Sequence, residues 1–315
     1  MNPAVQGYTA AVVQSADHDA LTRISDDVSA VERLVLSNTA LRAALNDTAV
    51  PGSARRAILL DLLEGKVTPE ARRLTAFAAG SVAAPDVTSA LGWVSTRVRH
   101  AAEGQLFDEV ALSLTQARRR VGGYATVLFE DMSASELESL EDDLFRFARI
   151  VSATPLLRSA LTDRDLAVEA RVAVVSDLLE GKVPQTTLDL AGYAVTGGRA
   201  RDIVGTLEYL TEETARARGW RIAHVRAALP IDDAQATALS ESLASVTGSP
   251  VELQVVLDES LLSGALIRIG DLQVDATARG RIDALRDHLM PAGWEPTGFG
   301  VATRAARTGK TEGAN

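Results

Sequence analysis

The seven-residue stretch DLLEGKV occupies residues 61–67, and the same seven residues recur unchanged at 177–183. The offset of 116 positions also aligns the preceding segments, so that about 20 of 47 residues are identical between 21–67 and 137–183. Identity at this level over one fixed offset indicates an internal duplication. The repeated unit is about a hundred residues long, which is the size of a domain rather than of a solenoid repeat.

The sequence inside each unit has a helical period. Apolar residues recur three or four positions apart in both copies, as an amphipathic helix requires: Leu21, Ile24, Val28, Val31 and Val35 in the first, and Leu137, Leu140, Leu144, Phe147 and Val151 in the second. Ser133 stands three residues before Glu136, the spacing of a capping box. Gly65 and Gly181 each follow an apolar run and suit the end of a helix. We expect five or six short helices per unit, with residues 84–120 forming a long helical link between the units.

The last third of the chain changes period. Residues 221–226 alternate and end before Pro230, which predicts a strand. A helix capped by Asp232 or Asp233 is expected next, with an apolar stripe of Leu239, Leu243 and Val246. Further strands are predicted over 251–257, 265–269 and 273–275, with a hairpin at residues 270–271. A final amphipathic helix is expected over 276–289, followed by a tail without periodicity.

These patterns predict a mainly α protein with a small α+β C-terminal domain that contains a β-hairpin. The expected divisions are a first helical bundle over 1–119, a second over 120–219, the α+β module over 220–290 and a disordered tail over 291–315. Aromatic residues make up only 4% of the chain, so the cores must be built mainly from Ala, Leu, Val and Ile.

Composition excludes several classes of function. The formal net charge is −10, which argues against a nucleic-acid partner because phosphates require a basic face. The chain has no cysteine, which excludes disulfides, thiolate metal sites and cysteine catalysis. No run approaches 18 apolar residues, so no membrane span is expected, and residues 1–20 lack the pattern of a signal peptide.

Motifs that carry chemistry are weak in this sequence. Residues 309–311 read Gly-Lys-Thr, but Arg304 stands where a phosphate-binding loop requires its first glycine. The four histidines have no metal-ligand spacing. We therefore predict no catalytic, cofactor-binding or metal-binding residues.

The stretch over residues 258–271, DESLLSGALIRIGD, resembles the C-terminal signature of delta subunits of bacterial F-type ATP synthases, and residues 275–282 continue it. The family pattern has a glycine where Ser263 stands and Gly-Ser where Ala276 and Thr277 stand. A Tyr-Ala-x-Ala-Leu-like start of the family's helical domain is similar to residues 124–128. The resemblance covers about residues 120–290, and residues 1–119 look like an extra copy of the helical domain, as in actinobacterial delta subunits.

The resemblance implies a non-catalytic connector of the peripheral stalk, on the cytoplasmic face of the membrane and held there by other subunits. In the family, the helical domain binds the N-terminal helix of an alpha subunit, and the C-terminal domain binds the b-type stalk subunit. The groove candidates for the first partner are Tyr124, Val127, Leu128, Leu188, Leu190 and Ala194, and the stalk candidates are Leu261, Leu262, Ile267 and Ile269. For each of these residues, burial in the protein's own core is the competing interpretation.

Two other functions compete with this one. A general helical scaffold or regulatory module would explain the repeat but not residues 258–275. An enzyme with a site in the α+β module would require convergent polar residues, and the sequence offers only a hairpin and helix caps there.

Overall fold

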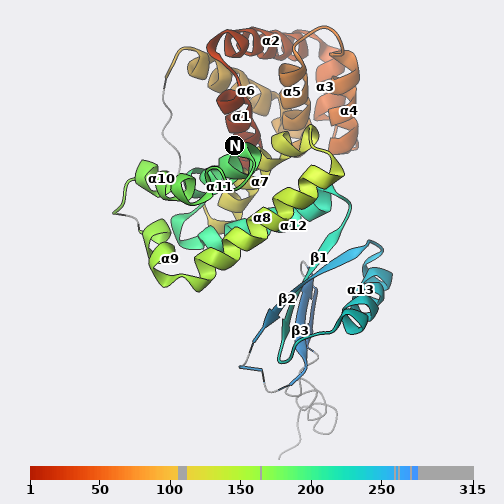
Figure 1. The fold of residues 1–315 in the computed structure, drawn as a ribbon. Coiled ribbons are helices and arrows are strands. Elements are labelled where there is room, and N and C mark those ends of the chain that lie inside the picture. The colour runs from red at the N-terminus through yellow and green to blue at the C-terminus, as the bar shows by residue number, and fades with distance from the viewer. Residues whose placement is uncertain (106–111, 164, 259, 262, 270–271, 276–315) are drawn as a thin grey trace, which may run out of the picture. The chain divides into compact units, whose positions relative to one another are not determined.

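The computed structural model describes residues 1–105, 112–163, 165–258, 260–261, 263–269 and 272–275 (Figure 1). The chain divides into two compact units, Met1–Arg221 and Ile222–Asn315. The first is built of helices, and the second contains a small sheet. The predicted mainly α class with a small α+β C-terminal part is therefore confirmed.

The first unit contains both copies of the repeat. Its first half comprises α1 (Pro3–Ser15), α2 (His18–Ser37), α3 (Thr39–Asn46), α4 (Gly52–Leu62), α5 (Pro69–Ser81), the 3-10 turn η1 (Ala84–Asp86) and α6 (Val87–Ala102). Its second half comprises α7 (Leu114–Glu130), α8 (Ala134–Ala153), α9 (Pro155–Thr162), α10 (Val168–Leu179), α11 (Gln185–Gly197), η2 (Ala200–Asp202) and α12 (Ile203–Ala217). The bounds of α2, α3 and α5, shifted by the offset of 116, coincide with those of α8, α9 and α11.

Equivalent local signals produce these equivalent helices. The Asp17 side chain caps α2 by accepting from the amide of Ala20 at 2.8 Å. At the equivalent position Ser133 caps α8, and Glu136 completes the predicted capping box by accepting from the Ser133 amide at 2.8 Å. After α4 and α10, Gly65 and Gly181 have positive φ angles of 65° and 71°. Glycine is favoured at both because other residues are strained in this left-handed conformation.

Each copy has its own hydrophobic core. The apolar runs predicted in α2 and α8 are buried in full. Tyr8 stacks on Phe77 with ring centroids 4.3 Å apart in the first core, and the equivalent Tyr124 stacks on Tyr193 at 3.9 Å in the second. Aromatic residues are few in this chain, and one stacked pair lies at the equivalent position in each copy.

The predicted long helical link over 84–120 is wrong. Residues 87–102 form α6, which buries Val87, Leu91, Val94 and Val98 in the first core and is the equivalent of α12. The apolar face of α6 therefore packs into the first bundle and does not bridge the two bundles. The expected division between residues 119 and 120 falls inside α7.

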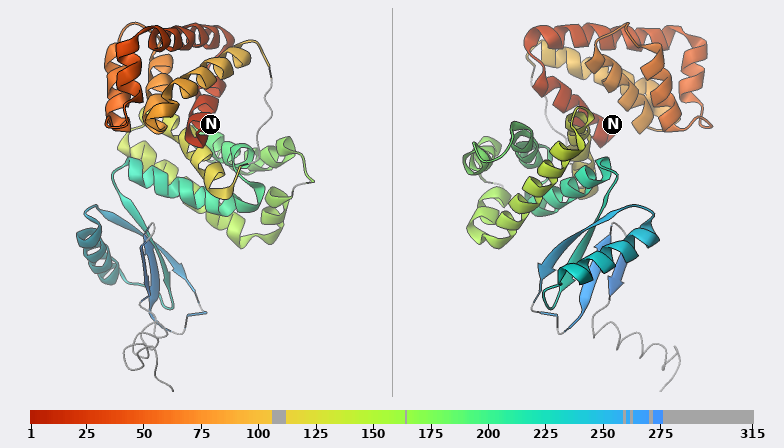
Figure 2. Two further views of the ribbon diagram at one scale, coloured as in Figure 1. Left: turned by 180° about the vertical axis from the view of Figure 1, so that it is seen from behind. Right: turned by 45° about the vertical axis from the view of Figure 1, so that its right-hand side comes forward.

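The second unit is a four-stranded sheet with one described helix. The strands β1 (Arg221–Ala227), β2 (Val251–Leu257), β3 (Ala265–Ile269) and β4 (Leu272–Asp275) lie in the order β2-β1-β3-β4. β3 is antiparallel to both of its neighbours, with Val225 opposite Ile267 and Ile267 opposite Val274. Helix α13 (Asp233–Thr247) covers one face of the sheet (Figure 2), and Leu243 joins the small core.

The predicted apolar stripe of α13 is only partly right. Leu243 is buried and Leu239 packs against the core, but Val246 is 70% exposed. Asp232, rather than Asp233, is the cap, and it forms a capping box with Gln235. The hairpin at residues 270–271, the final helix over 276–289 and the tail lie outside the described residues.

Candidate functional site

The two helical copies pack on each other where α1 crosses α7. The crossing is made by Gly7 and Gly123, which are equivalent in the repeat. A Cβ on Gly7 would lie 1.7 Å from the carbonyl oxygen of Arg120, and one on Gly123 would lie 2.0 Å from that of Ala4. Arg120 and Ala4 are themselves equivalent, so the contact is reciprocal, as in a two-fold symmetric interface. Only glycine permits so close an approach of two helix backbones.

A second reciprocal contact flanks the crossing. The Tyr8 hydroxyl donates to Glu130 Oε2 at 2.8 Å, and the Tyr124 hydroxyl donates to Gln14 Oε1 at 3.0 Å. Burial raises the pKa of the Tyr8 hydroxyl well above its usual value, and the charge of Glu130 adds to this. Burial, with a smaller effect of Asp189, raises the pKa of Tyr124 to about 12. Each copy's first helix thus receives a hydrogen bond from the core tyrosine of the other copy.

An open groove lies in the second copy, beside this crossing. It has a volume of about 440 Å³. Its walls come from α1, α7, α10 and α11, with lining residues Ala11, Gln14, Ser15, Tyr124, Val127, Leu128, Val172, Ser176, Gln185, Leu188, Asp189, Gly192, Tyr193 and Thr196. The walls are helices, and Val127, Leu128, Val172 and Leu188 give the lining apolar surface, which suits a groove that accepts the apolar face of another helix.

The structure brings four of the six predicted groove residues together. Tyr124, Val127, Leu128 and Leu188 line the groove. Leu190 and Ala194 are instead 0% and 1% exposed and belong to the core of the second copy. Both lie on the face of α11 that turns inward, because residues four apart share a helix face.

Sequence reasoning missed the contribution of the first copy to this groove. Ala11, Gln14 and Ser15 of α1 form one wall. It also missed Val172 and Asp189. The repeated glycine at positions 7 and 123 was a usable signal for a helix crossing, but periodicity alone does not show which helices cross.

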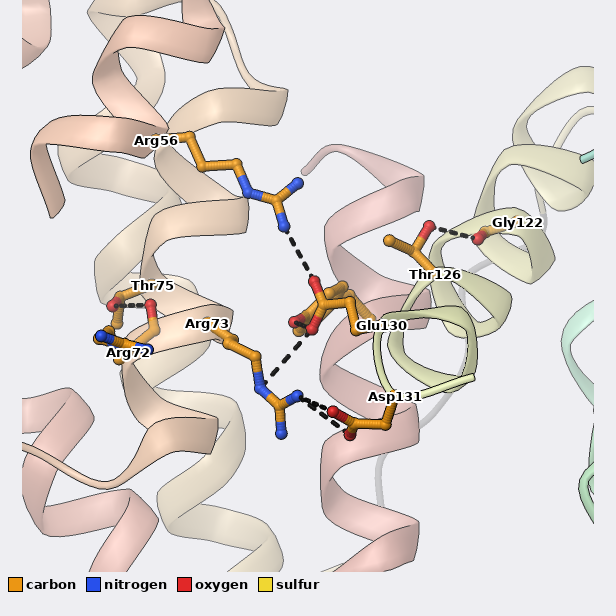
Figure 3. Close-up of polar contacts among 9 residues, drawn as sticks. Arg56, Arg72, Arg73, Thr75, Gly122, Thr126, Glu130 and Asp131 are labelled. Carbon is orange, nitrogen blue, oxygen red and sulfur yellow. Dashed lines mark hydrogen bonds and ion pairs between the residues drawn. The ribbon is translucent and has the colours of Figure 1, made fainter. Parts of the chain in front are cut away.

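The equivalent place in the first copy carries an ion-pair network (Figure 3). Arg56 of α4 lies 2.9 Å from Glu130, and Arg73 of α5 lies 3.6 Å from the same carboxylate. Arg73 also pairs with Asp131 at 2.9 Å. The guanidinium of Arg56 sits over the Phe77 ring, 5.7 Å from its centroid. Charged side chains thus bridge the first copy's α4 and α5 to the end of α7.

The stalk candidates in the second unit are placed differently from one another. Ile267 and Ile269 are 6% and 5% exposed and belong to the core of the sheet, so their side chains shape this module from inside. Leu261 is partly exposed, and Leu262 lies outside the described residues. Other large apolar side chains of this unit are exposed, among them Leu229 and Leu257.

Within the described ranges, His, Asp and Glu side chains do not gather in groups of three or more that could hold a metal ion. In the same part of the chain, no helix is both long and apolar enough to cross a membrane.

Comparison with known proteins identifies relatives over most of the chain. The family model for the ATP synthase delta (OSCP) subunit matches residues 5–80 and 121–289. The ATP synthase subunit delta of Parafrankia sp. (strain EAN1pec) is 34% identical over 267 residues, which cover 85% of this chain and 86% of that protein. That of Nocardia farcinica (strain IFM 10152) is 32% identical over 279 residues, which cover 89% of this chain and 93% of the relative.

Two further matches are shorter or more distant. The ATP synthase subunit delta of Thermobifida fusca (strain YX) is 39% identical over 176 residues. That match covers 56% of this chain and 65% of the relative, which is just under two thirds of its length. A chain in the cryo-EM structure of the Toxoplasma gondii mitochondrial ATP synthase hexamer is 16% identical, with a TM-score of 0.39, and the match covers 54% of this chain and 96% of that one. On the family model and the long matches, the chain belongs to the ATP synthase delta (OSCP) subunit family.

Proposed function

We propose that this protein is a non-catalytic connector of the peripheral stalk of an F-type ATP synthase. It links the catalytic head of alpha and beta subunits to the b-type stalk subunit and keeps the head from turning with the central shaft. The observation that carries the proposal is the open groove between α1, α7, α10 and α11 in a chain of the delta family.

The groove is the proposed site for the N-terminal helix of an alpha subunit. An amphipathic helix binds such a groove by burying an apolar stripe against side chains spaced along its walls. Val127, Leu128 and Leu188 are partly exposed in the groove and supply apolar contact area. Leu190 and Ala194 support the site from the core beneath it.

A connector under torque requires stiffness rather than chemistry. The close crossing at Gly7 and Gly123 and the two tyrosine hydrogen bonds join the helical copies into one unit. Because close-packed interiors deform little, such a unit transmits a load between partners bound at different places. No step of this role needs a catalytic residue, and we assign none.

The second unit is the proposed binding site for the b-type stalk subunit. Leu261 and Leu262 remain the candidates for direct contact. Ile267 and Ile269 act through the core of the sheet, which holds the surface in shape. In this arrangement the protein lies at the cytoplasmic face of the membrane, held there by the other subunits.

The test is a calorimetric titration of the full chain with a synthetic peptide of the N-terminal helix of the same organism's alpha subunit. The full chain is required because α1 of the first copy lines the groove. We expect binding, and we expect Leu128→Arg to weaken it at least about tenfold, because truncating or charging a groove anchor removes roughly 1.4 kcal/mol or more. Leu114→Arg is the matched control, since Leu114 is an exposed leucine of the same helix outside the groove. A wild-type chain that binds no peptide would contradict the proposal.

A further inference from the structure

The two copies share one helical framework but differ in the side chains around the groove. Position 172, Val in the second copy, corresponds to Arg56 in the first, and position 189, Asp in the second copy, corresponds to Arg73. The chemistry at these places is therefore apolar and acidic in the second copy and basic in the first.

In the first copy these arginines are used internally. Arg56 covers the ring of Phe77 and pairs with Glu130, and Arg73 pairs with Glu130 and Asp131. A helix entering this place would have to displace the Arg56 side chain and separate ion pairs to Glu130, whose side chain is only 16% exposed. Separating a partly buried ion pair leaves charges without their partners, which opposes binding.

Among the described residues of the second copy, no arginine at the equivalent positions crosses the groove, because Val172 and Asp189 replace Arg56 and Arg73. Val172 lines it in place of an arginine, and Tyr193, the equivalent of Phe77, is part of its lining. Asp189 stands at the groove on an exposed position of α11, where its carboxylate accepts from Gln185 Nε2 at 2.7 Å. Among the described residues that line the groove, Asp189 is the only Asp, Glu, Lys, Arg or His, so the groove has a negative charge beside apolar lining residues such as Val127, Leu128 and Leu188.

We propose that each chain holds one partner helix, in the second-copy groove, and that Asp189 selects a helix with a Lys or Arg beside its apolar face. This inference rests on the proposed function and adds the number of bound helices and the charge that the partner must carry. The duplication then provides one binding site and an internal brace rather than two equivalent sites. In this scheme the first copy contributes a groove wall through Gln14 of α1.

The same peptide titration of the full chain tests the inference with charge variants. We expect one peptide per chain. Asp189→Asn should weaken binding by about threefold, the size expected when one exposed ion pair is lost. Asp189→Arg, which installs the first-copy residue, should weaken it by about tenfold or more, because attraction is replaced by repulsion. Glu180→Arg is the matched charge reversal, at an exposed acidic residue that does not line the groove.

A second peptide completes the design. In it, the basic residues beside the apolar stripe are replaced by Gln. This peptide should bind the wild type about as weakly as the native peptide binds Asp189→Asn. Its binding to Asp189→Asn should be little weaker than that, because either change alone already removes the ion pair. Two peptides per chain, or an Asp189→Arg affinity equal to that of Glu180→Arg, would overturn the inference and leave the proposed function standing. A wild-type chain that binds no peptide would remove both.

Discussion

The glycine crossing of α1 and α7 predicts a specific effect of adding one methyl group. In Gly7→Ala the new Cβ would lie 1.7 Å from the carbonyl oxygen of Arg120 and 2.9 Å from the amide nitrogen of Tyr124. Both are backbone atoms inside a helix, so neither can rotate away. The helices must separate by more than about 1 Å, since carbon and oxygen in contact stay at about 3.3 Å or more. The packing of both copies is then disturbed.

The magnitude follows from two opposing effects. Overpacking of a well-packed interface costs up to about 3 kcal/mol. Replacing glycine by alanine inside a helix contributes about 1 kcal/mol in the opposite direction. The net loss is about 2 kcal/mol in the free energy of unfolding of the first unit. For a unit of this size, that corresponds to a decrease in Tm of about 4–8 °C.

Differential scanning calorimetry of the full chain provides the assay. Gly192→Ala is the matched control, because its Cβ would meet only a methyl group of Val172 at 3.9 Å, which is ordinary contact. This variant should keep or raise the Tm, through the helix propensity of alanine. The reasoning would be refuted if Gly7→Ala melted at or above the wild-type temperature, as Gly192→Ala is expected to do.

Two further predictions concern the hydrogen bonds at this crossing. Glu130→Ala leaves the buried Tyr8 hydroxyl without its acceptor and should lower the free energy of unfolding by about 1–3 kcal/mol. Asp131→Ala, at a side chain that is 75% exposed, should change the free energy of unfolding by less than about 0.5 kcal/mol. Equal effects of the two variants in thermal melting would count against the network. The pKa of Tyr124 is raised to about 12 in the folded chain, above about 10 when unfolded. Because the folded state then holds the Tyr124 proton more tightly than the unfolded state does, Tyr124 contributes to stability below about pH 10. This contribution is lost as the pH rises toward about 12. Tyr124→Phe should flatten the decline of Tm over this range, and an unchanged slope would contradict it.

Much of the fold could be predicted from local patterns. The period of the apolar residues in α2 and α8, the capping box at Ser133 and the strand over residues 221–226 are short-range signals, and the structure follows them. The repeat doubled the information, since each helix of one copy has a counterpart in the other. The long link failed because an amphipathic helix has the same period whether it covers its own bundle or bridges two bundles.

The sequence by itself determined the duplication, the change from helices to strands after residue 220 and the resemblance of residues 258–282 to the delta family. Those features lie in spacings along the chain, where helix and strand periods and turn residues act over a few positions. Only the tertiary structure decided that Leu188 faces a groove while Leu190 lies in the core. Only the tertiary structure showed that α1 supplies a wall of the second copy's groove. It also showed that Arg56 reaches Glu130 at the equivalent place in the first copy. These contacts join residues far apart in sequence, and they depend on a helix crossing whose geometry is set by backbone contact rather than by any local period.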